Sequence, residues 1–293
     1  MHDSDLWDAS SIVDAAGCDN RVLIVGAGKM GAAILQGLAN VFKAGLITVC
    51  EPDEAQRADI SRRFPGITVL ASLNQIDDHT YGSDDWIVLA VKPQIIGSVL
   101  DDVNRIGLQA TVISVAVGIP LAFFAEALPL AGIIRIMPNL PVMIGEGMIL
   151  ITASDRTPTE VVDAVAEAFT ELGDVAYVEE NQIDVGAAIS GSGPAYFALV
   201  VSALEQAGIA AGLSASLARD LANTTMMGTA DMIDMTGEDP LVIAQAVQSP
   251  GGTTQRAVAV LEDSGLTSMF KSAVDAAIAR AHELADQTND ADL

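Results

Sequence analysis

The sequence contains few of the side chains that enzymes commonly use for acid–base chemistry. It has three histidines, His2, His79 and His282, and no lysine lies between Lys92 and Lys271. None of the histidines has a spacing typical of a general base or a metal ligand, and neither CxxC nor HxxxH occurs. We therefore expect no metal, and a reaction that needs little proton transfer from the protein.

Cysteine and aromatic residues are also scarce. The two cysteines, Cys18 and Cys50, are too few for a disulfide framework, and Cys50 lies in an apolar run that predicts a strand. Aromatic residues make up 4% of the chain while hydrophobic residues make up 51%, so the cores must be aliphatic. A reducing, cytoplasmic location is the expectation that follows.

Basic residues are outnumbered, because the formal net charge is −25. This charge argues against nucleic acid and against anionic membranes as partners. Residues 1–20 are acidic and lack the basic region and apolar core of a targeting signal, and no run is a clear membrane span. Residues 1–20 are predicted to be a loosely ordered extension and residues 288–293 a similar tail.

The first clear motif is a glycine-rich turn between a strand and a helix. An apolar run over residues 21–25 leads into Gly26-Ala-Gly-Lys-Met-Gly31, and residues 29–42 then have helical spacing. This context is the one that a dinucleotide-binding fingerprint requires. Gly26 permits the turn, Gly28 lets the backbone approach a pyrophosphate, and Gly31 allows the helix to pack closely on the strand.

Alternation of strands and helices continues beyond this turn. Further strands are expected at residues 46–50, 86–91, 111–115, 132–137, 148–152 and 175–178, with helices between most of them. The pattern predicts a Rossmann-type α/β domain over residues 21–179 with a parallel sheet. Ligands bind beyond the carboxyl ends of such strands, which directs attention to the loops at residues 90–94, 115–118 and 137–141.

The end of the second predicted strand bears on cofactor choice. Glu51 follows this strand about twenty residues after Gly31, where an acidic side chain usually accepts hydrogen bonds from the adenosine ribose. A 2′-phosphate there would meet a carboxylate, so we expect NADH to be used at least as well as NADPH. Arg57 opposes this prediction, but it has to reach back along a helix.

The second half of the chain has a different composition. Residues 180–287 are almost entirely helical in pattern and rich in Ala, Leu and Met, with breaks near residues 191–194, 208–214, 237–240 and 249–252. The helices are apolar on more than one face and need burial on several sides. A domain this small cannot provide it, so we expect a dimer or a larger symmetric assembly.

Within this half, residues 246–262 (AVQSPGGTTQRAVAVLE) could hold an anionic substrate. Pro250 and the paired glycines end one helix, and Thr253 and Thr254 open the next. Free backbone N–H groups at such a helix start suit a carboxylate. One threonine hydroxyl could cap the helix, while the other could face a substrate nitrogen. Ser190 or Ser192 could likewise cap the helix that follows, or line the pocket.

Six segments resemble the pyrroline-5-carboxylate reductases in order and approximate spacing. They are VGAGKMG, AVKPQ, SVAVGI, RIMPNLP, AISGSGPAYF and AVQSPGGTT, and the resemblance extends over roughly residues 21–286. It implies reduction of Δ1-pyrroline-5-carboxylate to L-proline with NADPH or NADH. It also implies a Rossmann domain followed by a helical domain that forms an interlocked dimer.

The resemblance also implies site residues. Those for the cofactor are Val25, Gly26, Ala27, Gly28, Lys29, Met30, Gly31, Glu51, Asn74, Ala90, Val91, Lys92, Pro93, Val115, Ala116 and Val117. Asn74 matches its counterpart with a different local spacing. Those for the substrate are Glu180, Gly252, Thr253 and Thr254, with Thr254 at the imine nitrogen as the catalytic residue. Ala246 stands where some members place an Asn that reaches the cofactor of the neighbouring subunit.

Three other functions fit parts of the sequence. A β-hydroxyacid dehydrogenase shares the fold plan but needs a lysine in the helical domain that is not suitably placed here. A general imine reductase differs only in substrate, and the anion site at residues 252–254 favours an imino acid. A dinucleotide-sensing regulator would have no need of that substrate site.

Overall fold

The computed structural model describes residues 20–107 and 109–291, with side-chain surroundings given up to Glu283. Residues 1–19 of the predicted extension (residues 1–20) lie outside the described residues. Contacts divide the chain into two compact units. The described chain up to Gly191, together with its C-terminal part from Ile278, forms the first unit, and Ser192–Ala277 forms the second. Each unit is described by itself.

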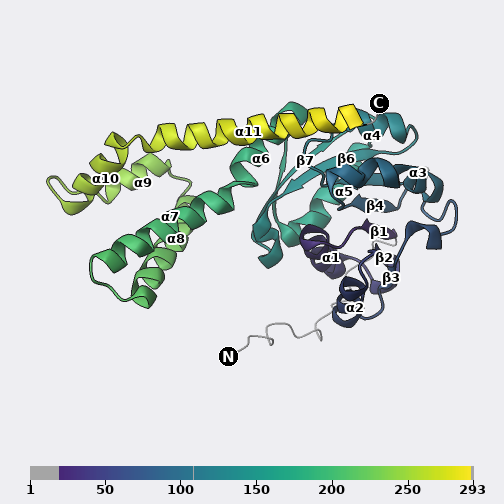
Figure 1. The fold of residues 1–293 in the computed structure, drawn as a ribbon, viewed down its shortest axis with the longest axis horizontal. Helices are drawn as coiled ribbons and strands as arrows, with labels where there is room; N and C mark the ends of the chain where they lie inside the picture. Colours follow the sequence, from purple (N-terminus) through teal and green to yellow (C-terminus); the bar gives the residue numbers. More distant parts are fainter. Residues whose placement is uncertain (1–19, 108, 292–293) are drawn as a thin grey trace. The chain divides into compact units, whose positions relative to one another are not determined.

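The first unit is built on an eight-stranded sheet with the order β3-β2-β1-β4-β5-β6-β7-β8 (Figure 1). Its first six positions have the strand order of the dinucleotide-binding Rossmann fold, as predicted. The strands are β1 Val22–Val25, β2 Ile47–Cys50, β3 Thr68–Leu70, β4 Trp86–Leu89, β5 Thr111–Ser114, β6 Ile133–Pro138, β7 Gly147–Ala153 and β8 Gly173–Tyr177.

Two features of the sheet differ from the sequence prediction. Strand β3 was not predicted, because it is three residues long and only partly buried, so its apolar pattern is weak. Strands β6 and β7 pair antiparallel, whereas the alternation predicted a parallel sheet. The connection over residues 139–146 explains this pairing, since it is too short for the crossover that parallel neighbours need.

Helices cover both faces of the sheet. One face carries α1 Lys29–Val41, α2 Glu54–Arg63 and α5 Thr159–Phe169, and their buried residues form a continuous core with the strands. The other carries α3 Ile96–Ile106, α4 Leu121–Ala127 and α6 Glu180–Ser190. Short 3-10 helices complete the unit: η1 Ala44–Leu46, η2 Leu73–Gln75, η3 Pro93–Ile95, η4 Leu140–Ile144 and η5 Thr170–Leu172.

The second unit consists of helices with the breaks that the sequence predicted. Its elements are α7 Gly193–Ala210, α8 Ala215–Thr236, α9 Pro240–Ala246, α10 Thr253–Asp263 and the first part of α11 Leu266–Ala291. Helices α7 and α8 form a hairpin, with Gly208 close to Ala218. Helix α11 continues to Ala291, so residues 288–291 of the predicted tail are helical.

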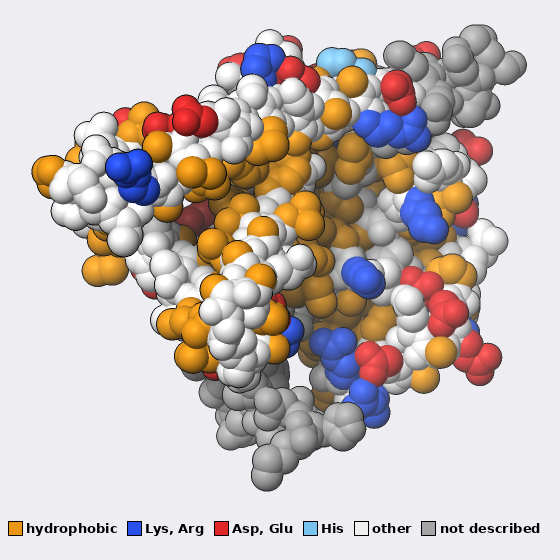
Figure 2. All heavy atoms as spheres, turned by 60° about the vertical axis from the view of Figure 1, so that its left-hand side comes forward, with side chains coloured by type: hydrophobic (Ala, Val, Ile, Leu, Met, Phe, Trp, Pro, Cys, Tyr) orange, Lys and Arg blue, Asp and Glu red, His pale blue; other side chains and the backbone are white. Residues whose placement is uncertain are grey.

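The second unit has almost no core of its own. Within residues 192–277, all of which the structure describes, the buried hydrophobic side chains are Ala218 and Ala222. Large apolar side chains are instead exposed, and Figure 2 shows hydrophobic side chains along the surface of these helices. Examples are Phe197, Leu199, Leu204, Met227, Met235 and Leu241.

One helical stretch, Glu180–Ala210, is long and apolar enough to cross a membrane by length and composition. It combines α6 and α7, which a turn at residues 191–192 separates. An apolar surface of this kind is equally expected of helices that pack against a second copy of the chain.

Candidate active site at the carboxyl edge of the sheet

The glycine-rich turn after β1 has the geometry that the fingerprint predicted. Gly26 has a φ of +89°, and a Cβ at Gly31 would lie 2.1 Å from the Gly26 carbonyl oxygen. Neither position therefore accepts a larger residue. Gly28 is exposed, and a Cβ there would meet nothing within 4 Å, so the space in front of this backbone is open.

Helix α1 starts at this turn with a free positive end. Its N-cap, Gly28, makes no side-chain cap, and the first turn holds no acidic residue. Helix α2 is different, because Asp53 caps it and Glu54 lies in its first turn. Unpaired N–H groups and the helix dipole make the start of α1 suitable for a phosphate group.

Glu51 lies directly beyond β2 and is 7% exposed. Its carboxylate accepts hydrogen bonds from the backbone N–H of Ala27 at 2.7 Å and of Asp53 at 2.9 Å. It is thereby fixed against the glycine-rich turn. Burial, and then the Glu51 charge, raise the pKa of the neighbouring Cys50 thiol to about 11, so this buried cysteine is protonated at neutral pH.

Arg57 lies closer to the end of β2 than its place on α2 suggested. Its Nη1 donates to the carbonyl oxygens of Glu51 at 2.9 Å and of Pro52 at 2.6 Å. The side chain therefore reaches back along the helix, so its position on α2 does not keep it from the strand end. The Glu51 carboxylate and the Arg57 guanidinium, which bear on cofactor choice in opposite directions, therefore both lie at the end of β2.

The loops after β4 and β5 meet the same turn. The N–H of Ala90 donates to the Val25 carbonyl at 2.8 Å, and a Cβ at Gly26 would lie 2.9 Å from the Ala90 carbonyl oxygen. The N–H of Val115 donates to the Leu89 carbonyl at 3.2 Å. Predicted residues 90–93 thus begin beside the glycine-rich turn, and residues 115–117 begin beside the end of β4, with Lys92 and Val117 exposed.

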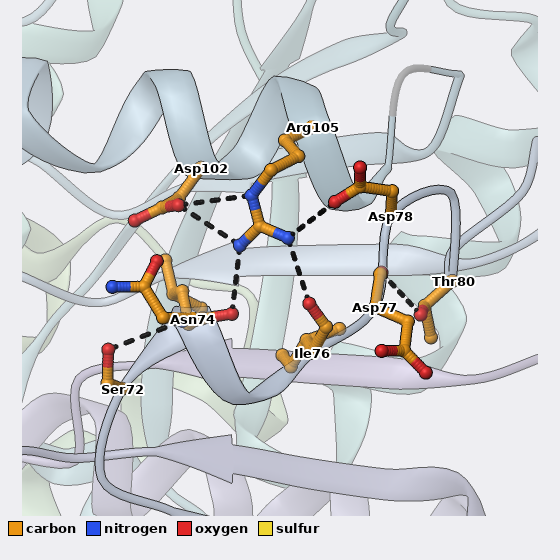
Figure 3. Close-up of polar contacts among 9 residues, drawn as sticks. Ser72, Asn74, Ile76, Asp77, Asp78, Thr80, Asp102 and Arg105 are labelled. Carbon is orange, nitrogen blue, oxygen red and sulfur yellow. Dashed lines mark hydrogen bonds and ion pairs between the residues drawn. The ribbon is translucent and has the colours of Figure 1, made fainter.

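Asn74 lies on η2, beyond the carboxyl end of β3. Ser72 begins this turn with a capping box, and its hydroxyl accepts from the Asn74 N–H at 3.3 Å. Arg105 on α3 holds the turn in place. Its guanidinium donates to the carbonyl oxygens of Leu73 at 3.1 Å and Ile76 at 2.9 Å, and it forms ion pairs with two aspartates, Asp102 and Asp78 (Figure 3).

Glu180, a predicted substrate residue, is the first residue of α6 and belongs to the first unit. Its Oε1 accepts from the Leu121 N–H at 2.6 Å and lies 3.0 Å from Nη1 of Arg135. Leu121 begins α4, directly after the β5 loop. Glu180 therefore lies at the start of α4, four residues after the predicted loop at residues 115–117.

Gly252, Thr253 and Thr254 belong to the second unit and form the start of α10. Gly251 has a φ of +72°, which favours glycine, and a Cβ at Gly252 would lie 3.0 Å from the Ser249 carbonyl oxygen, which is a tight contact. The Gly252 N–H donates to the Ser249 carbonyl at 2.9 Å. Gly252 thus shapes the turn, and the first free N–H groups are those of the threonines.

The threonine hydroxyls do not cap α10. Among residues 20–107 and 109–291, neither hydroxyl has a hydrogen-bond partner, and the helix has no acidic residue in its first turn. Thr254 is half-buried and Thr253 exposed. Neither threonine hydroxyl therefore has the capping role that the sequence left open. Ser190 also caps no helix start, because its hydroxyl donates to the Gly186 carbonyl within α6.

Three polar residues near the site were not among the predicted site residues. Arg135 pairs with Glu180. Asn139 joins η4 to the end of α6 through a hydrogen bond to the Ser190 carbonyl. Arg105 holds the turn that carries Asn74. Arg135 carried a readable signal, because a charge inside an apolar strand is costly unless it is paired. Within the described residues, no group of three metal-ligating side chains occurs.

Comparison with known proteins places this chain in one family. Residues 180–284 match the family model for pyrroline-5-carboxylate reductase dimerisation, and residues 21–118 match the model for NADP oxidoreductase, coenzyme F420-dependent. The pyrroline-5-carboxylate reductase of Synechocystis is 36% identical over 89% of this chain and 97% of its own length. The chain belongs to the pyrroline-5-carboxylate reductase family.

Solved structures agree with this membership. The pyrroline-5-carboxylate reductase of Coxiella burnetii has a TM-score of 0.79 at 30% identity, covering 90% of this chain and 98% of that one. The Plasmodium falciparum pyrroline carboxylate reductase, solved with NADP bound, has a TM-score of 0.78 at 26% identity over 91% and 98% of the two chains. Family membership confirms the predicted Rossmann-type domain followed by an all-helical dimerisation domain.

Proposed function

We propose that the protein reduces Δ1-pyrroline-5-carboxylate to L-proline with a nicotinamide dinucleotide, the final step of proline biosynthesis, in the cytoplasm. The observation that carries the proposal is that each unit contains one uncapped helix start at a glycine-rich turn. Helix α1 begins at an open glycine turn of Rossmann geometry, and α10 begins at the SPGGTT turn. The first helix start suits a phosphate group, and the second suits a carboxylate.

The residues around the first helix start fit a dinucleotide. The space at Gly28 is open, Gly31 packs against the turn without a side chain, and Glu51, which we assign to the ribose, is held against the turn by the Ala27 N–H. When bound, the reduced nicotinamide supplies a hydride. The protein's part is to hold the diphosphate at residues 26–31 and to place the ring beside residues 90–93 and 115–117.

The chemistry asks little more of the side chains. A protonated imine accepts a hydride at the carbon of its C=N bond, the π electrons move to nitrogen, and the product is a neutral secondary amine. The reaction therefore consumes one hydride and one proton, and the proton enters with the substrate. This balance agrees with the scarcity of histidine and lysine.

We assign substrate recognition to Thr253, Thr254 and Glu180, with Gly252 shaping the turn. The N–H groups at the start of α10 bind the carboxylate, and the Thr254 hydroxyl accepts a hydrogen bond from the substrate nitrogen. This set favours an imino acid over the neutral substrate of a general imine reductase. It also contains no lysine of the kind that a β-hydroxyacid dehydrogenase needs.

Turnover by the purified full-length protein tests the proposal. We expect pyrroline-5-carboxylate to cause loss of NADH or NADPH absorbance. A neutral cyclic imine should do so only at a much higher concentration. Absence of turnover with either nucleotide between pH 6 and 9 would contradict the proposed function. Nucleotide binding without turnover would favour the dinucleotide-sensing regulator.

Thr254→Ala tests the assigned hydroxyl. A hydrogen bond from substrate nitrogen to this hydroxyl contributes on the order of 1 kcal/mol or more, so we expect kcat/KM to fall about tenfold. Because the hydroxyl caps nothing in the structure, the midpoint of thermal unfolding should hardly change. Thr253→Ala removes the neighbouring exposed hydroxyl but keeps the backbone N–H assigned to the carboxylate, so as the matched control it should hardly change kcat/KM.

For cofactor choice we propose that NADH is used at least as well as NADPH. The Glu51 carboxylate is buried and held by two N–H donors, so it cannot move away from a 2′-phosphate. At contact distance the repulsion amounts to about 1 to 4 kcal/mol, depending on the local dielectric. Arg57 offsets part of this, but it is already bonded to two carbonyl oxygens.

The ratio of the two specificity constants tests this choice. We expect Glu51→Ser to shift the NADH/NADPH ratio of kcat/KM toward NADPH, and Arg57→Ala to shift it toward NADH. A strong preference of the wild type for NADPH, or an unchanged ratio in Glu51→Ser, would show that Glu51 only supports the turn.

A further inference from the structure

Arg135 occupies an unusual place in the middle of the sheet. It lies within the otherwise apolar strand β6, with Ser114 of β5 and Thr152 of β7 as its neighbours in register. All three side chains are buried, and Arg135 is 4% exposed. A guanidinium in this position loses its hydration and has to be compensated by anionic partners.

Both anionic partners come from α6, one helical turn apart. Nη1 of Arg135 lies 3.0 Å from Oε1 of Glu180, and Nη2 lies 3.6 Å from Oδ1 of Asp184. The second pair is too long for a hydrogen bond, and both of its atoms are buried without another hydrogen-bond partner among the described residues. Of the two ion pairs of Arg135, the one with Glu180 is therefore the closer.

The Glu180 carboxylate connects this pair to the carboxyl edge of the sheet. The same Oε1 accepts from the Leu121 N–H at 2.6 Å, at the start of α4. Four residues before Leu121 lies the exposed Val117, in the loop that we assign to the nicotinamide end of the cofactor site. The Glu180 side chain is 38% exposed, so part of its carboxylate remains accessible.

From these contacts we infer that Arg135 is a positioning residue that holds Glu180 for substrate binding. Arg135 and the Leu121 N–H fix one oxygen of the carboxylate from two sides, and the other oxygen is left for a ligand. The inference rests on the proposed function, since Glu180 is there a substrate residue. Arg135 itself is too deeply buried to touch the substrate.

A purely structural ion pair is the alternative. Buried ion pairs often contribute little net stability compared with an apolar replacement, so stability alone does not explain a charge inside β6. The two possibilities predict different kinetics. A structural pair changes the amount of folded protein, whereas a positioning residue changes kcat/KM for the imino acid through Glu180.

The experiment is a double-mutant cycle in the full-length protein, with Arg135→Met, Glu180→Gln and the double variant. Arg135→Lys tests rescue by a conserved charge, and Asp184→Asn weakens the cluster without touching Glu180. Asp85→Asn is the matched control, because Asp85 pairs with Arg21 at 2.7 Å at the amino edge of the sheet, away from the site. All assays are run well below the unfolding midpoint of the least stable variant.

We expect Arg135→Met to lower kcat/KM for pyrroline-5-carboxylate on the order of tenfold or more, with the KM for the nucleotide within about twofold. Arg135→Lys should recover part of the loss. Adding Arg135→Met to Glu180→Gln should lower kcat/KM little further, because both changes remove the same interaction. Asp184→Asn should give a smaller loss of the same kind, while Asp85→Asn should leave kcat/KM unchanged.

Two results would overturn the inference while leaving the proposed function intact. One is a wild type that turns over pyrroline-5-carboxylate while Arg135→Met, once corrected for folded protein, has wild-type kinetics. The other is multiplication of the Arg135 and Glu180 effects in the double variant, which means that they act independently. A wild type without turnover would overturn the proposed function and this inference together.

Discussion

The two units of this protein bury their hydrophobic residues in different ways. In the first, two helical layers enclose the sheet, and side chains such as Trp86, Phe124 and Phe169 are almost fully buried. In the second, Phe197 is 59% exposed and Leu199 is 69% exposed. The first unit can be stable within one chain, whereas the second has to obtain its core from another copy.

This difference assigns separate tasks to the two units. The proposed cofactor residues lie on a sheet whose packing fixes them within one subunit. The threonines of α10 lie on helices whose packing depends on self-association. Binding of the nucleotide should therefore tolerate a weakened dimer better than binding of the imino acid.

The largest expected effect comes from Leu199→Glu on α7. A carboxylate in an apolar interface loses its hydration, and an unpaired buried charge costs about 3 kcal/mol or more. We expect the assembly to dissociate at micromolar concentration, as measured by light scattering, with loss of turnover. Leu130→Glu in the first unit, where Leu130 is 57% exposed, is the matched control and should keep the assembly. An intact assembly in Leu199→Glu would contradict the comparison.

The next effect separates the two kinds of burial with one residue type. Phe169→Ala removes a ring with 0% exposure and should lower the free energy of unfolding by about 3 to 5 kcal/mol. Phe197→Ala should instead raise the dissociation constant of the assembly, measured by sedimentation equilibrium. Equal effects of both variants on self-association would show that the second unit is not the interface.

A smaller effect concerns nucleotide binding in the first unit. Gly28→Ala adds a methyl group where the structure has open space, so stability should hardly change. A bound diphosphate would be displaced by that methyl group, and we expect nucleotide affinity to fall roughly tenfold or more. Gly45→Ala, also in open space, is the control and should bind normally. Unchanged affinity in Gly28→Ala would place the diphosphate elsewhere.

The last expected effect is a pH dependence at the amino edge of the first unit. Burial raises the pKa of Asp85, but hydrogen bonds from Arg21 and Gly82 outweigh it and leave the pKa below the ordinary value for aspartate. The ionised carboxylate therefore stabilises the fold at and above the unfolded pKa near 4, and this contribution is lost as the pH falls through the depressed folded pKa.

Asp85→Asn tests this sign by urea unfolding at several pH values. At neutral pH the variant should be less stable by about 1 to 3 kcal/mol, because the buried site loses charged hydrogen bonds. The difference from wild type should shrink as the pH drops below about 4. A difference that stays constant over this range would mean that Asp85 has an ordinary pKa.

Much of the first unit could be predicted because its signals are local. Apolar runs of four or more residues marked the strands, and the Gly26, Gly28 and Gly31 spacing marked the turn. Strand β3 has only three residues and was therefore not recognised. The antiparallel pairing of β7 follows from the short connection before it, which the alternation of strands and helices does not reveal. Self-association could also be predicted locally, because the helices of residues 180–287 are apolar on more faces than a domain of this size can bury.

Contacts between distant residues could be decided only by the tertiary structure. The sequence determined that Glu51 and Arg57 lie near the end of β2, but only the fold ties Glu51 to Ala27 and bends Arg57 back to two carbonyl oxygens. It showed a charge at Arg135, but only the packing of α6 on β6 supplied Glu180 and Asp184. Periodicity along the chain reports which face is buried, whereas the partner of a buried charge depends on which elements the fold brings together.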